Sequence, residues 1–321
     1  MLLSLGLTMR IVGPLVAMLG TALLNSTLRQ EEGSSALPLW AGVPIALVAV
    51  VLGWTVFWLG RKVRIRARRH LTPVITSFEQ LRTVSYVLYL RPFVLDRSLA
   101  RSPDDAPGWW TRSPLELPWL TEEDFLVRQF ARLGRVVAIG EPGERLPLLG
   151  AERGYLPLDD WQGTVSELIE GAHVVMLSAA PGPGTVWEFT EALRTVAPTR
   201  LVLLIYTGPE VYDAFRVAAA RAYGDRSGRP AVAAVPAPGW PAMPELPDWP
   251  EPGPRRKGLG WEFPLRGVVS FDQHWNATFT RFDPVVPRLR WFRTVRRLLD
   301  RELEPMIGPL SGLPVRSGRI S

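Results

Sequence analysis

Residues 173–206, HVVMLSAAPGPGTVWEFTEALRTVAPTRLVLLIY, contain the clearest indication of the fold class. Two short apolar runs, His173–Ser178 and Arg200–Tyr206, enclose a segment with helical spacing, Thr185–Val196, which opens after a loop of alternating proline and glycine. Apolar runs without polar alternation are typical of parallel strands that are buried on both faces. The stretch therefore predicts a strand–helix–strand unit of a parallel sheet.

The same alternation continues in both directions along the chain. We expect strands at Val84–Leu90, Arg135–Ile139 and Gly267–Phe271, and helices at Thr121–Leu133, Asp160–Gly171, Pro209–Tyr223 and Val286–Leu303. Right-handed crossovers between parallel strands arrange such elements as a doubly wound, flavodoxin-like α/β domain, which we place at residues 84–306, with a tail at 307–321.

A proline-rich segment interrupts this domain before the last strand. Pro236–Pro254 contains eight prolines in 19 residues and excludes both helix and central strand. We interpret residues 230–258 as an inserted extended loop or linker. A proline-motif ligand for a partner protein is the alternative.

The N-terminal part, residues 1–60, contains two apolar segments. Ile11–Leu28 carries no charge, and Leu37–Leu59 has Trp40, Trp54 and Trp58 near its ends. About 20 apolar residues in a helix cross a bilayer, and tryptophans favour its interfaces. We therefore expect transmembrane helices at 11–28 and 37–59. A cleaved signal peptide is the alternative for the first, although TALLN at its end lacks a small-residue cleavage site.

The charges beside these helices predict their orientation. The juxtamembrane segment 61–83 begins with a basic run: Arg61, Lys62, Arg64, Arg66, Arg68 and Arg69. The connection between the helices has only Arg29, against Glu31 and Glu32. Because cytoplasmic loops are rich in Lys and Arg, we expect a plasma-membrane protein with two spans and both termini in the cytoplasm. The basic run is expected to contact the bilayer and its anionic headgroups rather than nucleic acid.

Composition limits the chemistry. The chain has no cysteine, which excludes disulfides, cysteine nucleophiles and cysteine metal sites, and it has only three histidines. We expect no metal and no bound cofactor. The net charge of +6 comes largely from the basic run. The sequence leaves homo-oligomer formation open.

Candidate site residues follow the predicted strands, because ligands of parallel sheets bind beyond the carboxyl ends of the strands. They are Arg91, Phe93 and Asp96 after the first strand, Gly140 and Glu144 after the second, and Ser178, Gly184, Thr185, Trp187 and Glu188 after the third. The last group opens a helix, whose free N–H groups suit an anion or ligand hydroxyls. Each has an ordinary alternative, since glycine and proline are common in turns and a glutamate is favoured near a helix N-terminus.

Gly184–Glu188 (GTVWE) resembles the G-T-x-x-E pattern of nucleoside deoxyribosyltransferases. Tyr89–Leu90 followed by Pro92–Phe93 is similar to the first strand and loop of that family. The same superfamily contains Toll/interleukin receptor (TIR) domains with the pattern W-C-x-x-E. Trp187 and Glu191 match that spacing, with Glu188 in place of the cysteine. The resemblance, which spans roughly residues 84–206, implies that a glutamate engages the ribose of a nucleoside or of NAD.

The resemblance leaves two candidate carboxylates, of which we favour Glu188 over Glu191. It implies an enzyme that cleaves the N-glycosidic bond of NAD or a related nucleotide. In that reading Trp187, Trp109 or Trp110 would stack on a base and Arg91 would hold a phosphate. Arg91 stands where the transferases have a small residue, and the loop after the first strand is longer than theirs. The alternative is a non-catalytic, membrane-tethered module that binds a nucleotide or a protein.

Overall fold

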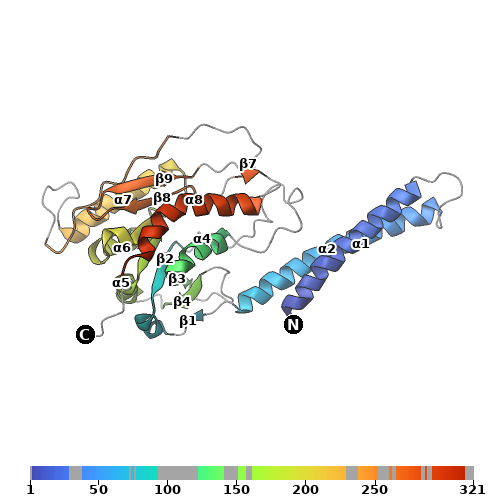
Figure 1. Cartoon of the computed structure of the whole chain (residues 1–321), viewed down its shortest axis with the longest axis horizontal. Coiled ribbons are helices and arrows are strands. Elements are labelled where there is room, and N and C mark those ends of the chain that lie inside the picture. The colour runs from blue at the N-terminus through green and yellow to red at the C-terminus, as the bar shows by residue number, and fades with distance from the viewer. Residues whose placement is uncertain are drawn as a thin grey trace. The chain divides into compact units, whose positions relative to one another are not determined.

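The computed structural model describes most of the chain, which divides into two compact units, Met1–Thr72 and Pro73–Ser321 (Figure 1). The described residues are 2–28, 38–71, 74–75, 77–92, 122–140, 151–156, 161–228, 238–251, 260–261, 265–282, 286–287 and 291–314.

The first unit is an antiparallel hairpin of α1 (Leu2–Leu28) and α2 (Leu39–Leu71). Its interface has small residues at every seventh position, and all of them are buried: Gly6, Gly13, Gly20 and Thr27 of α1, and Ala46, Gly53, Gly60 and Ala67 of α2. The backbones are in direct contact, because a Cβ added to Gly13 would lie 2.6 Å from the carbonyl oxygen of Gly53. A seven-residue repeat is also the spacing that coils two helices around each other with a left-handed twist.

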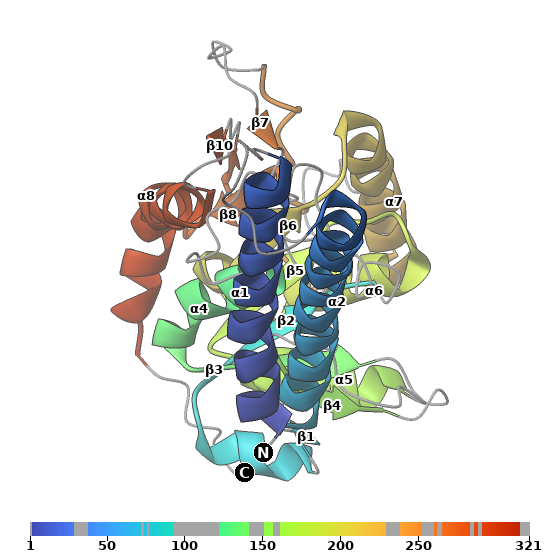
Figure 2. The ribbon, with the colours of Figure 1, turned by 90° about the vertical axis from the view of Figure 1, so that its right-hand side faces the viewer.

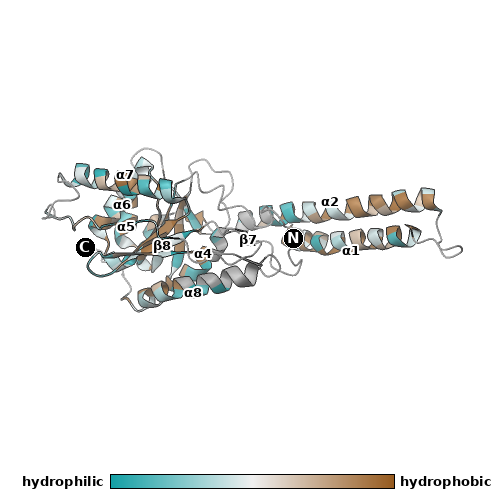
Figure 3. Ribbon diagram, turned by 90° about the horizontal axis from the view of Figure 1, so that it is seen from above, coloured by the Kyte–Doolittle hydropathy of each residue, from teal (hydrophilic) through white to brown (hydrophobic). Residues whose placement is uncertain are grey.

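Large apolar side chains cover the outside of this hairpin. Leu19 is 71% exposed, Val48 is 65% exposed and Trp40 is 81% exposed. Figure 3 shows that the apolar part of α2 gives way to a hydrophilic continuation toward its C-terminal end. Both helices are long and apolar enough to cross a membrane. A helix pair in water would bury these large side chains and expose the small ones, so the arrangement suits lipid.

The helix bounds extend the expected ones. α1 begins at Leu2, nine residues before the predicted span. The added turns include Gly6, which contacts Gly60 of α2 and extends the series of small residues at the helix interface. α2 continues to Leu71, so the basic run that begins at Arg61 is helical.

The second unit is built on a mixed, mostly parallel sheet with the strand order β1-β4-β3-β2-β5-β6-β8-β9. Its strands are β1 (Val74–Ile75), β2 (Tyr86–Leu90), β3 (Arg135–Gly140), β4 (Glu152–Tyr155), β5 (Val174–Ser178), β6 (Leu201–Ile205), β8 (Gly267–Phe271) and β9 (Ala277–Arg281). All six strands from β1 to β6 pair in parallel, and β8 and β9 are antiparallel. The central strands β2, β5 and β6 are buried along their whole length, as their unbroken apolar sequences predict.

Helices cover both faces of this sheet, as Figure 2 shows. One face packs against α5 (Trp161–Gly171), α6 (Pro183–Thr195) and α7 (Pro209–Ser227), and the other packs against α4 (Glu122–Phe130) and α8 (Trp291–Ser311). Each face of the sheet has its own hydrophobic core, and alternate residues of β2 point into the two cores. Leu88 lies in the core that α5, α6 and α7 cover, and Val87 lies in the core that α4 and α8 cover. In the described part of the unit, the 3-10 segments η1 (Phe78–Thr83), η4 (Ala131–Leu133) and η5 (Pro198–Arg200) lie before or after these elements.

Two sequence predictions about this unit are corrected, and the structure adds strands that were not predicted. The strand at Gly267–Phe271 exists, but it runs antiparallel to β6. The strands β4 and β9 were not predicted, because ERGY is short and polar and ATFTR is half-exposed. The last helix begins at Trp291 instead of Val286, because Val286 and Pro287 form β10, which pairs with β7 (Gly260–Trp261), and it continues to Ser311.

Residues 238–251 of the proline-rich insertion form no helix or strand, as expected, but they are packed rather than linker-like. We call this segment the strap. It lies along α7, with Tyr223 Oη donating to the carbonyl of Pro241 at 2.7 Å and Tyr212 Oη donating to that of Pro247 at 3.0 Å. The strap thus runs from the end of α7 back toward its beginning, which delivers the chain to the carboxyl edge of the sheet. This direction explains why β8 is antiparallel.

Candidate functional site

The helix α6 begins beyond the carboxyl end of the central strand β5. Gly182 is its N-cap in an extended conformation and Pro183 occupies its first turn, where the missing N–H costs nothing. Gly184 is half-buried, and a Cβ added there would meet nothing within 4 Å. Thr185 is buried beside it. The candidate residues of this loop therefore do lie together at the sheet edge where ligands of α/β proteins bind.

Glu188 lies on α6 and is largely buried. Within the part of the chain that the structure describes, no hydrogen bond or ion pair holds its carboxyl group. Burial raises the pKa of this carboxyl to about 8. A buried acid without a partner favours its neutral form, so Glu188 is mostly protonated at pH 7.

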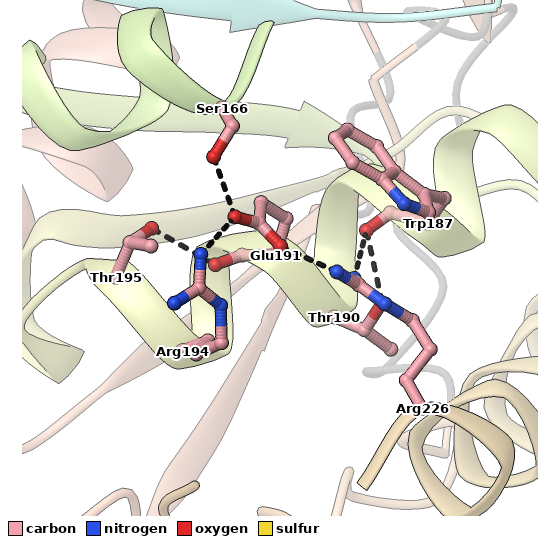
Figure 4. Close-up of polar contacts among 7 residues, drawn as sticks. All are labelled: Ser166, Trp187, Thr190, Glu191, Arg194, Thr195 and Arg226. Carbon is pink, nitrogen blue, oxygen red and sulfur yellow. Dashed lines mark hydrogen bonds and ion pairs between the residues drawn. The ribbon is translucent and has the colours of Figure 1, made fainter. Parts of the chain in front are cut away.

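Glu191, one turn further along α6, has the opposite environment (Figure 4). Its Oε1 accepts from Arg194 Nη2 at 2.5 Å and from Ser166 Oγ at 2.6 Å, and its Oε2 accepts from Arg226 Nη2 at 2.5 Å. Burial alone would raise its pKa, but the hydrogen bonds from Arg194, Ser166 and Arg226 outweigh it and hold the pKa at about 2. Glu191 is therefore an ionised residue that joins α5, α6 and α7.

Trp187, in the first turns of α6, contacts residues of the two neighbouring helices, α5 and α7. Its ring meets Trp161 of α5 edge to face, with 5.0 Å between the ring centroids. The Arg226 guanidinium lies 5.1 Å from the Trp187 centroid, so one face of the indole already carries a cation. Stacking of a base on Trp187 would have to use what remains of its surface.

Arg91 follows the end of β2 and is fully enclosed. Its Nη1 lies 2.5 Å from Glu123 Oε1 of α4, and Arg153 Nη2 of β4 lies 3.7 Å from Glu123 Oε2. All three side chains are buried completely, and Glu123 also accepts from the backbone N–H of Ala151 at 3.1 Å. The cluster joins the carboxyl end of β2 to α4 and β4, which is a structural use of the charge that we expected to hold a phosphate.

A pair of tyrosines lies beside this cluster, under the same face of the sheet. Tyr89 and Tyr206 place their hydroxyl oxygens 3.0 Å apart, and the Arg91 guanidinium lies 4.8 Å from the Tyr89 ring centroid. Burial raises the pKa of both hydroxyls. Ser178, at the end of β5, is fully buried and is close enough to Tyr89 to affect its pKa. These hydroxyls remain neutral donors and acceptors at physiological pH.

The remaining candidates divide into two groups. Gly140 ends β3 against Tyr155, because a Cβ there would come within 2.6 Å of the tyrosine ring, and the glycine is therefore explained by packing. Phe93, Asp96 and Glu144 lie outside the described residues, as do Trp109 and Trp110.

Sequence reasoning missed Glu123, Arg153 and Arg226. Glu123 had a detectable signal, since it lies three and seven residues before Leu126 and Phe130 and thus on the apolar face of α4. A carboxylate on such a face needs a buried cation. Arg153 and Arg226 had no such signal, because nothing in their local sequence indicates burial or a partner.

Among the described residues, no group of three or more His, Asp or Glu side chains is placed to bind a metal ion. Comparison of the chain with protein-family models, curated proteins and solved structures found no match.

Proposed function

We propose that this chain is a membrane-anchored enzyme that binds NAD or a related nucleotide at the carboxyl edge of its sheet and cleaves the N-glycosidic bond, with Glu188 as the catalytic residue. The observation that carries the proposal is the difference between the two glutamates of α6. Glu191 accepts hydrogen bonds from Arg194, Arg226 and Ser166, whereas Glu188 has no such partner among the described residues and its pKa is raised to about 8. Strongly shifted carboxyls without a structural partner are frequent at functional sites.

The chemistry follows from that environment. When the bond between the ribose carbon and the base nitrogen breaks, its electron pair leaves with the base and the sugar becomes an oxocarbenium-like cation. A positive charge that develops beside Glu188 lowers the pKa of its carboxyl, which releases its proton to solvent and stabilises the cation as the carboxylate. Water then adds to the ribose carbon and gives its proton to that carboxylate, which restores neutral Glu188. Nicotinamide leaves as a neutral molecule and needs no acid. A base that leaves as an anion could take its proton from neutral Glu188.

The arrangement of the sheet supports a doubly wound, flavodoxin-like domain related to the deoxyribosyltransferases and TIR domains. The strands β3, β2, β5 and β6 are parallel and adjacent in this order, so β2, the first of the four in the sequence, lies between β3 and β5. Helix α4 covers one face of these strands, and α5, α6 and α7 cover the other. This is the order in which the crevice for a ligand opens beside the first and third strands. The GTVWE sequence begins the helix that follows the third of these strands.

The hairpin supports insertion in a membrane, with the second unit in the cytoplasm. Its interface of small residues and its covering of large apolar side chains fit a lipid environment. At the basic end, Lys62 Nζ lies 3.6 Å from the ring centroid of Trp58, a pairing that suits the headgroup level. The basic run then extends into the region of anionic headgroups.

A non-catalytic binding module is the second candidate, and two contacts favour it. Arg91, which we expected to hold a phosphate, forms a buried ion pair with Glu123, and one face of Trp187 is covered by Arg226. Groups that are engaged in this way are less available to position a substrate for reaction.

The proposal is tested on the full chain in lipid nanodiscs, incubated with NAD, NADP and a panel of nucleosides, with products separated by chromatography. Release of nicotinamide or a free base supports the enzyme. A raised melting temperature with one of these compounds, without turnover, supports the binding module instead. If none of these compounds is cleaved and none raises the melting temperature, both the enzyme and the binding module are contradicted.

A further inference from the structure

Arg226, in the last turn of α7, contacts α6 at three successive acceptors. Its Nη1 donates to Thr190 Oγ1 at 2.6 Å and to the carbonyl oxygen of Trp187 at 3.2 Å, and its Nη2 donates to Glu191 Oε2 at 2.5 Å. Figure 4 shows the guanidinium facing the side of α6 that carries these groups. The carbonyl of Trp187 belongs to the peptide that joins Trp187 to Glu188, so Arg226 holds the backbone directly at the candidate site.

The strap keeps Arg226 in this position from the outside. The guanidinium lies between two indoles, 5.1 Å from the ring centroid of Trp187 and 5.4 Å from that of Trp240. Trp240 in turn packs edge to face on Tyr223, whose hydroxyl bonds the strap at Pro241. A cation between two aromatic faces has little freedom to rotate, and its remaining N–H groups point toward the acceptors of α6.

The other end of the strap has a similar arrangement that does not reach α6. Trp249 packs on Tyr212, and Arg216 lies 6.0 Å from the Tyr212 centroid while it pairs with Asp213 and Asp248. Arg216 is thus a matched control for Arg226: both are arginines of α7 beside a tyrosine that the strap covers, but only Arg226 bonds the helix of Glu188.

We propose that Arg226, clamped by Trp240 of the strap, is a positioning residue that fixes Trp187 and Glu188 at the carboxyl edge of the sheet. This inference rests on the proposed function of Glu188. It adds that Arg226 keeps Glu188 in its buried environment. Among the described residues, the ion-paired groups at this part of α6 are Glu191, Arg194 and Arg226 itself, and Glu170 also acts on Arg194. Because a lysine keeps the charge of Arg226 but reaches fewer acceptors, Arg226→Lys tests the geometry and not the charge.

The test measures the titration of Glu188 in the full chain in nanodiscs by infrared difference spectroscopy as a function of pH. The protonated-carboxyl band that is absent from Glu188→Gln identifies the residue. We expect a midpoint near 8 in the native chain. Arg226→Lys and Trp240→Leu should lower this midpoint by about one pH unit or more, because a loosened α6 lets water reach the carboxyl. Arg216→Lys should leave it in place, and Trp240→Phe, which keeps an aromatic face, should restore most of the native value.

An unchanged Glu188 midpoint in Arg226→Lys, with a loss of stability equal to that of Arg216→Lys, would overturn the positioning role. Should Arg226→Lys not fold, Trp240→Leu and Trp240→Phe decide the question by the same midpoint. The titration requires no turnover, so a shifted midpoint in a chain that cleaves no nucleotide would retain the positioning role and reject the catalytic one.

Discussion

Glu188 and Glu191 lie one turn apart on α6, yet the pKa of the first is about 8 and that of the second is about 2. The difference comes from their partners and not from the helix they share. Glu191 accepts hydrogen bonds from two arginines and a serine, whereas burial raises the pKa of Glu188 and no partner within the described part of the chain offsets it. A protein that leaves one of two neighbouring carboxyls unpaired loses stability at that position, which is a common property of functional sites.

Replacement of Glu188 by glutamine should stabilise the chain in a pH-dependent way. The folded pKa is raised to about 8, so the contribution of this group to stability is fully present below about pH 4.5 and is lost as the pH rises through 8. Glu188→Gln should therefore match the native chain at pH 4 and exceed it by about 4 kcal/mol at pH 8. Thermal unfolding at pH 4 and pH 8 checks this prediction. The control is Glu210→Gln on the surface of α7, whose stability relative to the native chain should not increase from pH 4 to pH 8. An equal effect of Glu188→Gln at both pH values would contradict the raised pKa.

Replacement of Glu191 by glutamine should have the opposite effect. Its folded pKa is lowered to about 2, so its contribution is present above about pH 4.5 and is lost as the pH falls toward 2. Removal of a buried carboxylate that serves two arginines should cost about 3 kcal/mol at pH 7. Urea unfolding at several pH values should show the difference from the native chain narrowing below pH 4.5. A difference that stays constant down to pH 2.5 would argue against the ion pairs.

The hairpin interface should not accept a large residue at its centre. A Cβ on Gly53 would lie 2.5 Å from both the backbone nitrogen of Ala17 and the carbonyl oxygen of Gly13, so Gly53→Leu must separate the helices. The separation is measured with a disulfide between Thr27→Cys and Gly42→Cys, whose Cβ atoms would be 3.4 Å apart in the native hairpin. We expect Gly53→Leu to reduce the disulfide yield strongly, whereas Val48→Leu on the exposed face leaves it unchanged. Equal yields would refute the close packing.

The orientation in the membrane is open to a direct test because the native chain has no cysteine. A single cysteine at Ser35, between the helices, should react with a membrane-impermeant maleimide on intact cells. One at Val217, which is 63% exposed on α7, should react only after permeabilisation. The reverse pattern would place the second unit outside the cytoplasm.

The parts of the fold that were predictable are those in which local sequence and final environment agree. Strands β2, β5 and β6 have unbroken apolar sequences because both of their faces are covered, and α6 opens where proline and glycine permit a helix start. The direction of β8 was not predictable, because it depends on the strap lying along α7. The short polar strand β4 is recognisable only through the burial of Arg153.

The candidate site was predictable only in part, for a similar reason. The sequence predicted the helix that carries both glutamates and favoured Glu188, but it contained no sign of their different environments. That distinction depends on Arg226, which is 35 residues beyond Glu191 and reaches it through tertiary packing. Glycine recurs at every seventh position of α1, at Gly6, Gly13 and Gly20. The length and hydropathy of the segments predicted membrane spans, but the close contact between the two helices at these glycines was not predicted.

The catalytic role of Glu188 is tested by the rate at which Glu188→Gln releases a base from NAD or a related nucleotide. The variant is compared with the native chain, with Glu191→Gln and with Glu210→Gln, all in nanodiscs at pH 7. We predict that Glu188→Gln lowers the rate about 100-fold or more while its melting temperature stays at or above the native value, and that Glu210→Gln stays within about two-fold of the native rate. A native rate of release by Glu188→Gln would show that this carboxyl takes no part in the reaction and would contradict the account.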